Sequence, residues 1–344
     1  MKTLKITFSL LLFTFFNYAQ TVHTVDNRSQ SGAQFTTLQT AITAAVAGDI
    51  IHVHPSPTGY GNVTVNKQLK IIGLGHDPIT HTQGLVAKVN LISFLPNSAN
   101  SIVTGLDVGT IRTTGASSNK DNMHIIHNKV SSISGTANNW IIEGNYITNT
   151  SSVAINSSST GWVIKNNFML GGVANLHVST IVTNNIFLST TTGTSQTFIN
   201  NCTFTQISNN IFIATNANMT TIGISNSPFV DMRKNLTYNF GGGIIADLPE
   251  GDPMNPSNIN NTNPNFASMP SITVADFYNY DYHLNNPILG TDGMTNIGIH
   301  GLNFAFDHQG RPDLQPYPIT VTINNNIIAP GQNLSVRFTA AQKQ

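Results

Sequence analysis

The amino-acid sequence predicts an all-β fold: a single-stranded right-handed parallel β-helix, or solenoid, with a short N-terminal capping helix and a small C-terminal β appendage. Three observations lead to this prediction. A short apolar pattern that ends in Asn recurs at irregular spacing, apolar and polar residues alternate within it, and a segment with helical spacing precedes the first strands. Irregular turns between short regular strands are typical of a β-solenoid, whose stacked coils form one domain.

The chain of 344 residues carries little charge. Lys and Arg number 15, Asp and Glu also number 15, and charged residues make up 9% of the chain, against roughly 25% in typical soluble domains. This composition argues against a nucleic-acid partner, because such a surface needs concentrated basic residues. Uncharged polar residues, above all the 44 Asn, must supply solubility instead. The lone Cys202 cannot form an internal disulfide and should be buried. As a separate expectation, the protein should be a monomer.

Residues 1–19 are predicted to be a cleavable signal peptide. Lys2 and Lys5 precede an apolar run from Ile6 to Phe16. The run is too short for a transmembrane helix, so we expect no membrane span. We expect export, either into the surroundings or to the cell surface.

After this segment one stretch has helical periodicity. Leu38, Ile42 and Ala45 are spaced as one face of a helix, and Gly48 is a stop signal. A short helix here would cover the open end of the core, because the ends of a solenoid need caps. The alternating segments that follow it predict the first strands.

The repeats can be aligned on one Asn in each copy. These residues are Asn128, Asn145, Asn167, Asn185, Asn210 and Asn235. The residue three positions before each Asn is apolar and the next one is nearly always polar, as in Ile164 and Lys165. Neighbouring strand residues face opposite ways, so the first column should point inward and the second outward. Coils stack about 4.8 Å apart, so the Asn side chains should form an internal ladder whose amides bond one another.

Two further columns predict contacts between adjacent coils. Glu143 and Lys165 occupy the same outward column and should form an ion pair. Trp140 and Trp162 share a column five residues before the ladder Asn and should stack in the core. We assign residues 22–312 to the solenoid, with about eleven or twelve coils. Residues 313–344 are assigned to a short C-terminal β appendage.

Two blocks of the sequence carry a resemblance. The first contains TLQTAITAA, AGDIIHV and IIGLG, and the second contains NPNF at 263–266, YDYHLNNPILGTDGMTNIGIHG at 280–301 and Gly-Arg-Pro at 310–312. They resemble the opening and the closing coils of the pectin-lyase-like superfamily of right-handed parallel β-helix proteins, and uncharacterised exported Bacteroidetes β-helix repeat proteins in particular. The resemblance covers nearly the whole mature chain. It implies the fold but no single activity, because the superfamily includes lyases, hydrolases, esterases, epimerases and adhesins.

The charged residues of the central coils offer one candidate catalytic group. A glycoside hydrolase needs clustered carboxylates, and no Asp-Asp pair occurs. A polysaccharide lyase needs a cation that neutralises a uronate carboxylate and a base that removes the neighbouring proton. Asp231, Arg233 and Lys234 could supply these groups. The alternative is a surface Asp–Arg pair that contributes under about 1 kcal/mol.

One acidic segment could hold a metal ion. Asp247, Glu250 and Asp252 lie in a stretch rich in Gly and Pro, and their carboxylates are candidate ligands for Ca²⁺. The alternative is a solvated loop without an ion. Nearby, Tyr278 and its alternating neighbours could present aromatic faces to a sugar or form a buried strand.

Two classes of function remain. The first, which we expect, is an exported protein that binds polysaccharide or serves at the cell surface without catalysis. The alternative is a polysaccharide lyase that acts by β-elimination on a uronate-containing polysaccharide. The lyase requires Asp231, Arg233, Lys234 and the acidic segment to converge on one groove.

Overall fold

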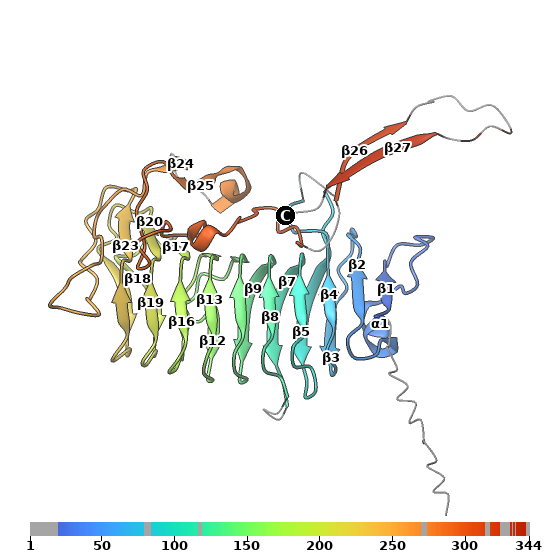
Figure 1. Cartoon of the computed structure of the whole chain (residues 1–344), viewed down its shortest axis with the longest axis horizontal. Coiled ribbons are helices and arrows are strands. Elements are labelled where there is room, and N and C mark those ends of the chain that lie inside the picture. The colour runs from blue at the N-terminus through green and yellow to red at the C-terminus, as the bar shows by residue number, and fades with distance from the viewer. Residues whose placement is uncertain are drawn as a thin grey trace, which may run out of the picture.

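The computed structural model describes residues 20–78, 84–115, 119–269, 274–313, 317–323, 331, 333 and 335–341. The predicted signal peptide, residues 1–19, lies outside this part of the chain. The described residues form a row of stacked coils, a right-handed parallel β-helix (Figure 1), which confirms the predicted fold class. Among the described helices, none is long and apolar enough to cross a membrane.

The first parallel sheet takes one short strand from each of ten coils. In spatial order these strands are β1 (Val22–Val25), β2 (Ile50–Val53), β4 (Lys70–Ile72), β6 (Ile102–Thr104), β8 (His124–Ile126), β10 (Ile141–Glu143), β13 (Val163–Lys165), β16 (Ile181–Thr183), β19 (Gln206–Ser208) and β22 (Asp231–Arg233). The sheet forms one long face of the solenoid.

The second sheet begins with long strands and then divides into two branches. Its long strands are β3 (Asn62–Val65), β5 (Lys88–Phe94), β7 (Asp107–Thr113) and β9 (Lys129–Gly135). The branch that we call the upper branch contains β11 (Tyr146–Ile147), β14 (Phe168–Met169), β17 (Ile186–Ser189), β20 (Ile211–Ala214) and β23 (Leu236–Asn239). The lower branch contains β12 (Ile155–Ser157), β15 (Val173–Ala174), β18 (Ser195–Asn200) and β21 (Thr221–Ser225). The sheet divides because the first residues of β9 pair with β11 and its last residues pair with β12.

The predicted capping helix is present as α1 (Leu38–Ala44). Thr37 is its N-cap, and its Oγ1 accepts a hydrogen bond of 3.2 Å from the backbone N–H of Thr40. Such a cap satisfies one of the free N–H groups at the start of a helix. Leu38, Ile42 and Ala45 are all buried in the main core, so the helix closes the N-terminal end of the solenoid.

The predicted inward column is confirmed by the register of the first sheet. Ile142 lies opposite Ile125 on one side and Ile164 on the other. The six members of this column are fully buried: Ile125, Ile142, Ile164, Val182, Ile207 and Met232. The polar residues beside them face outward, as the alternation of a strand requires.

The predicted contacts between coils are also confirmed. The rings of Trp140 and Trp162 stack with centroids 4.8 Å apart and planes 5° apart, and both side chains are buried. Lys165 Nζ lies 2.9 Å from Glu143 Oε1 across adjacent coils. Cys202 is buried, as expected.

The predicted Asn ladder is continuous from Asn128 to Asn235 and extends one coil further, to Asn258. At each step the backbone N–H and the Nδ2 of one Asn donate to the Oδ1 of the next. From Asn145 to Asn167 these distances are 2.9 and 3.0 Å. Nδ2 of Asn145 also donates to the backbone oxygen of Ile125, one coil earlier. Each amide is thereby satisfied inside the core, where an unpaired amide would cost about 1–3 kcal/mol.

A left-handed residue directly follows most first-sheet strands and turns the chain toward the ladder. Its φ is positive at Gly105, His127, Gly144, Asn166, Asn184, Asn209 and Lys234. Gly and Asn adopt this conformation most readily. This explains why the repeats often carry a second Asn directly before the ladder Asn, a preference whose cause the sequence pattern did not reveal.

After β23 the chain turns back along the coils. We call residues 263–313 the strap; its elements are β24 (Phe266–Ser268), the 3₁₀ helix η1 (Val274–Asn279), β25 (Asp281–Leu284) and the 3₁₀ turn η2 (Gly301–Asn303). It ends beside the early coils, where the backbone N–H of His76 donates to the oxygen of Gln309 at 2.8 Å (Figure 1). The closing coils expected in this block are therefore not formed. The first sheet has ten strands, and one irregular coil follows them in the stack, against the eleven or twelve coils expected.

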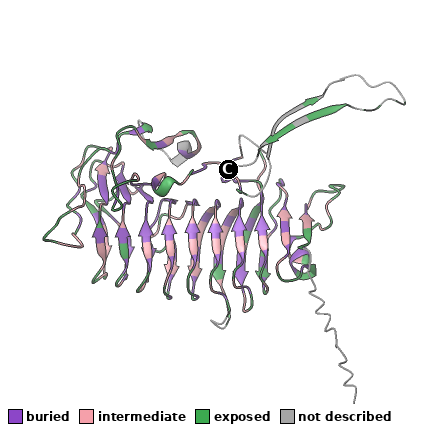
Figure 2. Ribbon diagram, in the orientation of Figure 1, coloured by how far each residue is buried: buried purple, intermediate pink, exposed green. Residues whose placement is uncertain are grey.

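The strap covers the outward side of the upper branch and forms a second apolar cluster with it. The upper branch contributes Tyr146, Phe168, Leu170, Ile186, Leu188, Ile211, Ile213 and Leu236. The strap contributes Phe266, Met269, Phe277, Tyr282, Ile297, Ile299 and Phe306. Figure 2 shows buried residues both along the coils and along the strap. Strands β17 and β20 are therefore buried on both sides.

Left-handed Asn residues at the corners hold the strap in place. Nδ2 of Asn166 donates to the backbone oxygen of Ile299 at 3.0 Å, and Nδ2 of Asn184 donates to that of Asn296 at 3.1 Å. After the strap, β26 (Tyr317–Ile323) and β27 (Val336–Ala341) pair antiparallel within the predicted C-terminal appendage. Figure 1 shows this hairpin pointing away from the coils.

Candidate functional site

The charged residues predicted from the sequence lie on the outward side of the first sheet, at its last two strands. Gln206 of β19 lies opposite Asp231 of β22, and Ser208 lies opposite Arg233. These four residues and Thr291 of the strap line a groove of about 250 Å³. We call it the β19–β22 groove. Its walls carry one carboxylate, one guanidinium, one amide and two hydroxyl groups.

Asp231 and Arg233 form an ion pair within this groove. Nε of Arg233 donates to Oδ1 of Asp231 at 2.7 Å, and both side chains are partly exposed. This hydrogen bond, together with the charge of Asp231 and then of Asp252, raises the pKa of Arg233 above its usual value. Arg233 is therefore a stable cation that can neutralise a carboxylate, and a poor base.

Lys234 lies at the corner that follows β22. It is one of the left-handed residues, with φ of 53°, and its backbone N–H donates to Oγ of Ser257 at 3.3 Å. Its side chain is half-buried. Lys234 follows Arg233 in the sequence but lies at the turn, and it is not among the residues that line the groove.

The acidic segment lies directly beside β22. The backbone N–H of Gly251 donates to the oxygen of Met232 at 2.9 Å, so this segment continues the stack as an irregular coil. A Cβ on Gly251 would lie 2.0 Å from Oδ1 of Asp231, which leaves no room for a larger residue. Asp252 is close enough for its charge to act on Arg233. The structure therefore brings Asp231, Arg233 and the acidic segment together.

The three carboxylates of this segment have different surroundings. Glu250 accepts hydrogen bonds from the backbone N–H groups of Ser257 and Asn258, at 2.9 and 3.1 Å. Asp252 accepts from its own loop, and these bonds, led by that of the Asn255 side chain, lower its pKa. Asp247 is exposed. Two of the three candidate Ca²⁺ ligands thus already stabilise the loop, and the Ca²⁺ site stays a prediction.

An exposed aromatic pair lies just before β19 and β22, at the end of these strands opposite to the corner that Lys234 occupies. Phe204 and Phe229 each stand two residues before a first-sheet strand, and their rings stack with centroids 5.1 Å and planes 8° apart. Their exposed fractions are 60% and 73%. Phe229 precedes β22, the last strand of the first sheet, so among the described residues no further ring of this column stacks on its outer face.

The backbone at both Phe residues is left-handed, with φ of 51° and 62°. The same position has a positive φ in most earlier coils, where it is occupied by Gly48, Asn100, Asn122, Asn139, Gly161 and Ser179. Gly and Asn, which occupy five of these six positions, adopt this conformation readily, whereas a bulky residue is strained there by about 1–2 kcal/mol. The last two coils therefore place an aromatic ring where the fold favours Gly or Asn.

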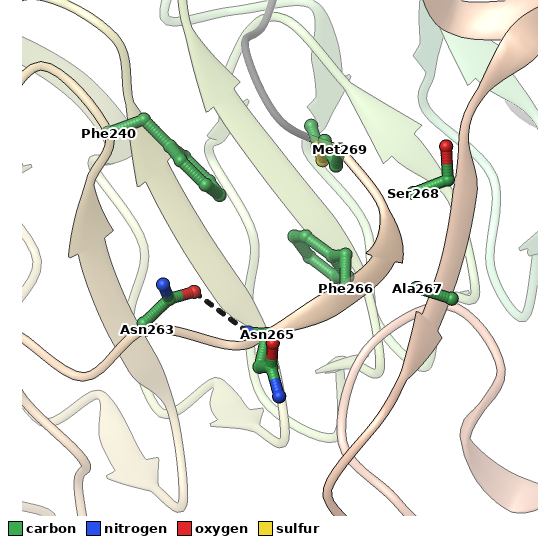
Figure 3. A pocket seen from close by; sticks show the side chains of 7 residues that line it. All are labelled: Phe240, Asn263, Asn265, Phe266, Ala267, Ser268 and Met269. Carbon is green, nitrogen blue, oxygen red and sulfur yellow. Dashed lines mark hydrogen bonds between the residues drawn. The ribbon is translucent and has the colours of Figure 1, made fainter.

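Two other hollows in the described surface are lined by no charged residue. One of about 480 Å³ lies at the start of the strap and is lined by Phe240, Asn263, Asn265, Phe266, Ala267, Ser268 and Met269 (Figure 3). Another of about 300 Å³ is lined by Ser, Thr, Asn and Gly of the lower branch and its neighbours. The β19–β22 groove is smaller than both, but it combines charged, amide and hydroxyl groups and lies on the same two coils as the aromatic pair.

Sequence reasoning missed two parts of this site. Phe204 and Phe229 have a sequence signal, because the position two residues before each strand is usually Gly, Asn or Ser. That column could have been aligned in the same way as the Asn ladder. Thr291 has no such signal, because the strap brings it to the groove from far along the chain.

No family model matches this chain, and no curated protein matches it. The parallel β-helix is shown by the structure itself, and membership in the pectin-lyase-like superfamily stays a prediction.

Proposed function

We propose that this protein is exported and binds a polysaccharide without catalysis, through the aromatic pair Phe204–Phe229 and the adjoining β19–β22 groove. The observation that supports this proposal most is the aromatic pair. Two large apolar rings are exposed in strained backbone positions where the fold favours Gly or Asn. Strain and exposed apolar surface of this kind concentrate at functional sites.

The chemistry of the pair fits a sugar ring. The face of an aromatic ring is negative and attracts the C–H groups that line one side of a pyranose. A ligand that covers about 50 Å² of each ring would gain roughly 1 kcal/mol per ring from apolar burial. This gain is of the same size as the backbone strain, so binding can offset what the fold loses at these positions.

The groove supplies the polar part of the site. Gln206, Ser208 and Thr291 offer amide and hydroxyl groups that can exchange hydrogen bonds with sugar hydroxyls. Gln206 and Ser208 both lie on β19, which begins two residues after Phe204, and Thr291 reaches the same groove from the strap. A linear chain of sugars could therefore contact the rings and the groove at the same time.

Affinity electrophoresis and calorimetry with a panel of neutral and uronate polysaccharides test this proposal. The informative variant is the double substitution Phe204→Asn and Phe229→Asn, because Asn suits a left-handed backbone. We expect its stability to stay within about 1 kcal/mol of the parent, since relief of strain offsets the lost ring contact. Its affinity should fall at least about tenfold, as for loss of aromatic anchors elsewhere.

Val46→Ala serves as the control, because Val46 is an exposed apolar residue near the capping helix, 57% exposed and remote in sequence from the site. It should leave affinity unchanged. Binding that survives the double Asn substitution would refute the aromatic site, and no binding to any polysaccharide of the panel would refute the function.

One observation keeps the lyase as a second candidate: Asp231, Arg233 and the acidic segment lie together beside one groove. In that reaction Arg233 would neutralise the uronate carboxylate, and Lys234 would have to act as the base. The unsaturated product absorbs in the ultraviolet, so incubation with uronate polysaccharides, with and without Ca²⁺, detects it. A rise that Arg233→Ala and Lys234→Ala each abolish would establish the lyase, and a constant absorbance would exclude it.

A further inference from the structure

A cluster of potential metal ligands lies in the strap. Asp281 and His283 belong to β25, and His300 directly precedes η2. One ligand atom from each of the three side chains lies within 4.8 Å of the others. Among the described residues, no other group of three His, Cys, Asp or Glu side chains comes this close. The sequence analysis did not identify this cluster.

The two residues of β25 already point their ligand atoms at each other. His283 Nδ1 and Asp281 Oδ1 lie 2.6 Å apart, and the side chains are 62% and 51% exposed. The ring of His300 stacks on that of His283, with centroids 3.5 Å apart and planes 17° apart.

His300 has a nitrogen without a partner. Its Nε2 is buried and has no hydrogen-bond partner among the described residues. When the other nitrogen, Nδ1, carries the ring proton, the lone pair of Nε2 is free for an ion, as in histidines that ligate metals.

We propose that Asp281, His283 and His300 bind one divalent transition-metal ion of the Zn²⁺ class, through the carboxylate, His283 Nδ1 and His300 Nε2. The ion would take the place of the proton between Asp281 and His283. Two nitrogen ligands and one oxygen ligand suit Zn²⁺ and similar ions, whereas Ca²⁺ prefers oxygen ligands alone. The exposure of Asp281 and His283 leaves the fourth position to water.

The site needs small changes in distance and a tilt of the exposed His283 ring, because the lone pairs of two nearly parallel rings do not converge on one ion. Bonds of about 2.0–2.1 Å in a tetrahedral site put two ligand atoms roughly 3.3 Å apart. Asp281 and His283 would therefore separate by about 0.7 Å, and the nitrogen of His300 would approach by up to about 1.5 Å. Both residues of β25 are partly exposed, so rotation of their side chains can provide this. The ion would then connect β25 to the turn before η2 and stabilise the strap.

The test is equilibrium dialysis and calorimetry of the whole protein, prepared without a polyhistidine tag, with Zn²⁺ and with Ca²⁺ as separate titrants. We expect one Zn²⁺ per chain and a thermal midpoint that rises with Zn²⁺. Co²⁺ should bind at the same site and give the visible absorption of a tetrahedral complex with nitrogen and oxygen ligands. Ca²⁺ should not compete.

His283→Ala is the main variant, because its exposed side chain can be removed without a cavity; it should weaken Zn²⁺ binding at least about 100-fold. Asp281→Asn should weaken it as well, and His300→Ala should abolish it if that variant folds. His124→Ala is the matched control, a half-buried histidine on β8 outside the cluster, and should bind as the parent does. Absence of saturable Zn²⁺ binding, or binding that His283→Ala leaves unchanged, would overturn the proposal.

Discussion

Asn167→Ala tests whether the ladder stabilises the coils. The side chain of Asn167 is fully buried. Its Nδ2 donates to the backbone oxygens of Ile142 and Lys165, at 2.9 and 2.8 Å, and to Oδ1 of Asn185 at 3.0 Å. Its Oδ1 accepts from the backbone N–H and from Nδ2 of Asn145, at 2.9 and 3.0 Å. The substitution removes these five hydrogen bonds together.

The magnitude follows from the groups that are left behind. The backbone N–H of Asn145 loses its acceptor inside the core, and a buried donor without a partner costs about 1–3 kcal/mol. The remaining bonds contribute about 0.5–1.5 kcal/mol each, and part of this is recovered because Asn145 and Asn185 keep other partners. We therefore expect the free energy of unfolding to fall by about 4 kcal/mol, near the upper end for a single substitution.

Urea denaturation followed by tryptophan fluorescence measures this loss, because Trp140 and Trp162 are buried in the coils beside the ladder. Asn258→Ala is the comparison. Asn258 ends the ladder and is half-buried, so water can replace the bonds that it accepts from Asn235. Asn258→Ala should lower the free energy of unfolding by less than half as much as Asn167→Ala does. Equal losses for the two variants, or a loss below about 1 kcal/mol for Asn167→Ala, would refute the reasoning.

Three further predictions follow from the fold. Burial lowers the pKa of His76 to about 3 from 6.5; the unfolded chain therefore binds the proton better, and His76 alone should lower the free energy of unfolding by about 1.4 kcal/mol per pH unit as pH drops from 6.5 toward 3. Denaturation curves across this range check it, and His76→Gln should flatten the dependence. Phe277→Ala should lower the free energy of unfolding by about 3–5 kcal/mol, because the ring of Phe277 in the strap stacks on that of Tyr146 in the coils, with centroids 3.9 Å apart. Limited proteolysis of this variant should then cleave the strap before the coils. Glu143→Gln should cost under about 1 kcal/mol, since its ion pair with Lys165 is partly exposed, and a larger loss or one independent of salt would contradict this.

The parts of the fold that could be predicted are those that repeat. A residue such as Ile142 or Asn145 occupies an equivalent place in every coil, so alignment of the copies reveals its environment without any knowledge of distant contacts. The same alignment placed Glu143 opposite Lys165. In a solenoid the neighbours of a residue are set by the repeat, and this makes local patterns sufficient.

The strap could not be predicted in the same way. Its apolar residues, such as Phe277 and Tyr282, contact coils that lie more than a hundred residues away, and no period in the sequence links them to Tyr146 or Phe168. The resemblance of the motifs at 263–266, 280–301 and 310–312 favoured closing coils here. In the structure, β24 and β25 pair antiparallel with each other instead of joining the stack.

The candidate sites lie where the chain departs from its own repeat. The position two residues before each first-sheet strand is usually Gly, Asn or Ser, whereas the last two coils carry Phe there, and these two rings stack on each other and stay largely exposed. The strap is likewise an addition to the coils. Its Asp281, His283 and His300 lie close together and are not members of the apolar cluster that the strap forms with the upper branch. A sequence specifies its fold when local preferences agree with the whole, and natural proteins break that agreement mainly at functional sites. In a repeat protein each coil supplies the reference for the next, so such a departure can be recognised within a single sequence. We therefore favour Phe204 and Phe229 over the Asp231–Arg233 pair as the primary determinant of binding. The outward ion pair fits the polar column of the strands, whereas strained, exposed rings do not fit the left-handed column that favours Gly or Asn.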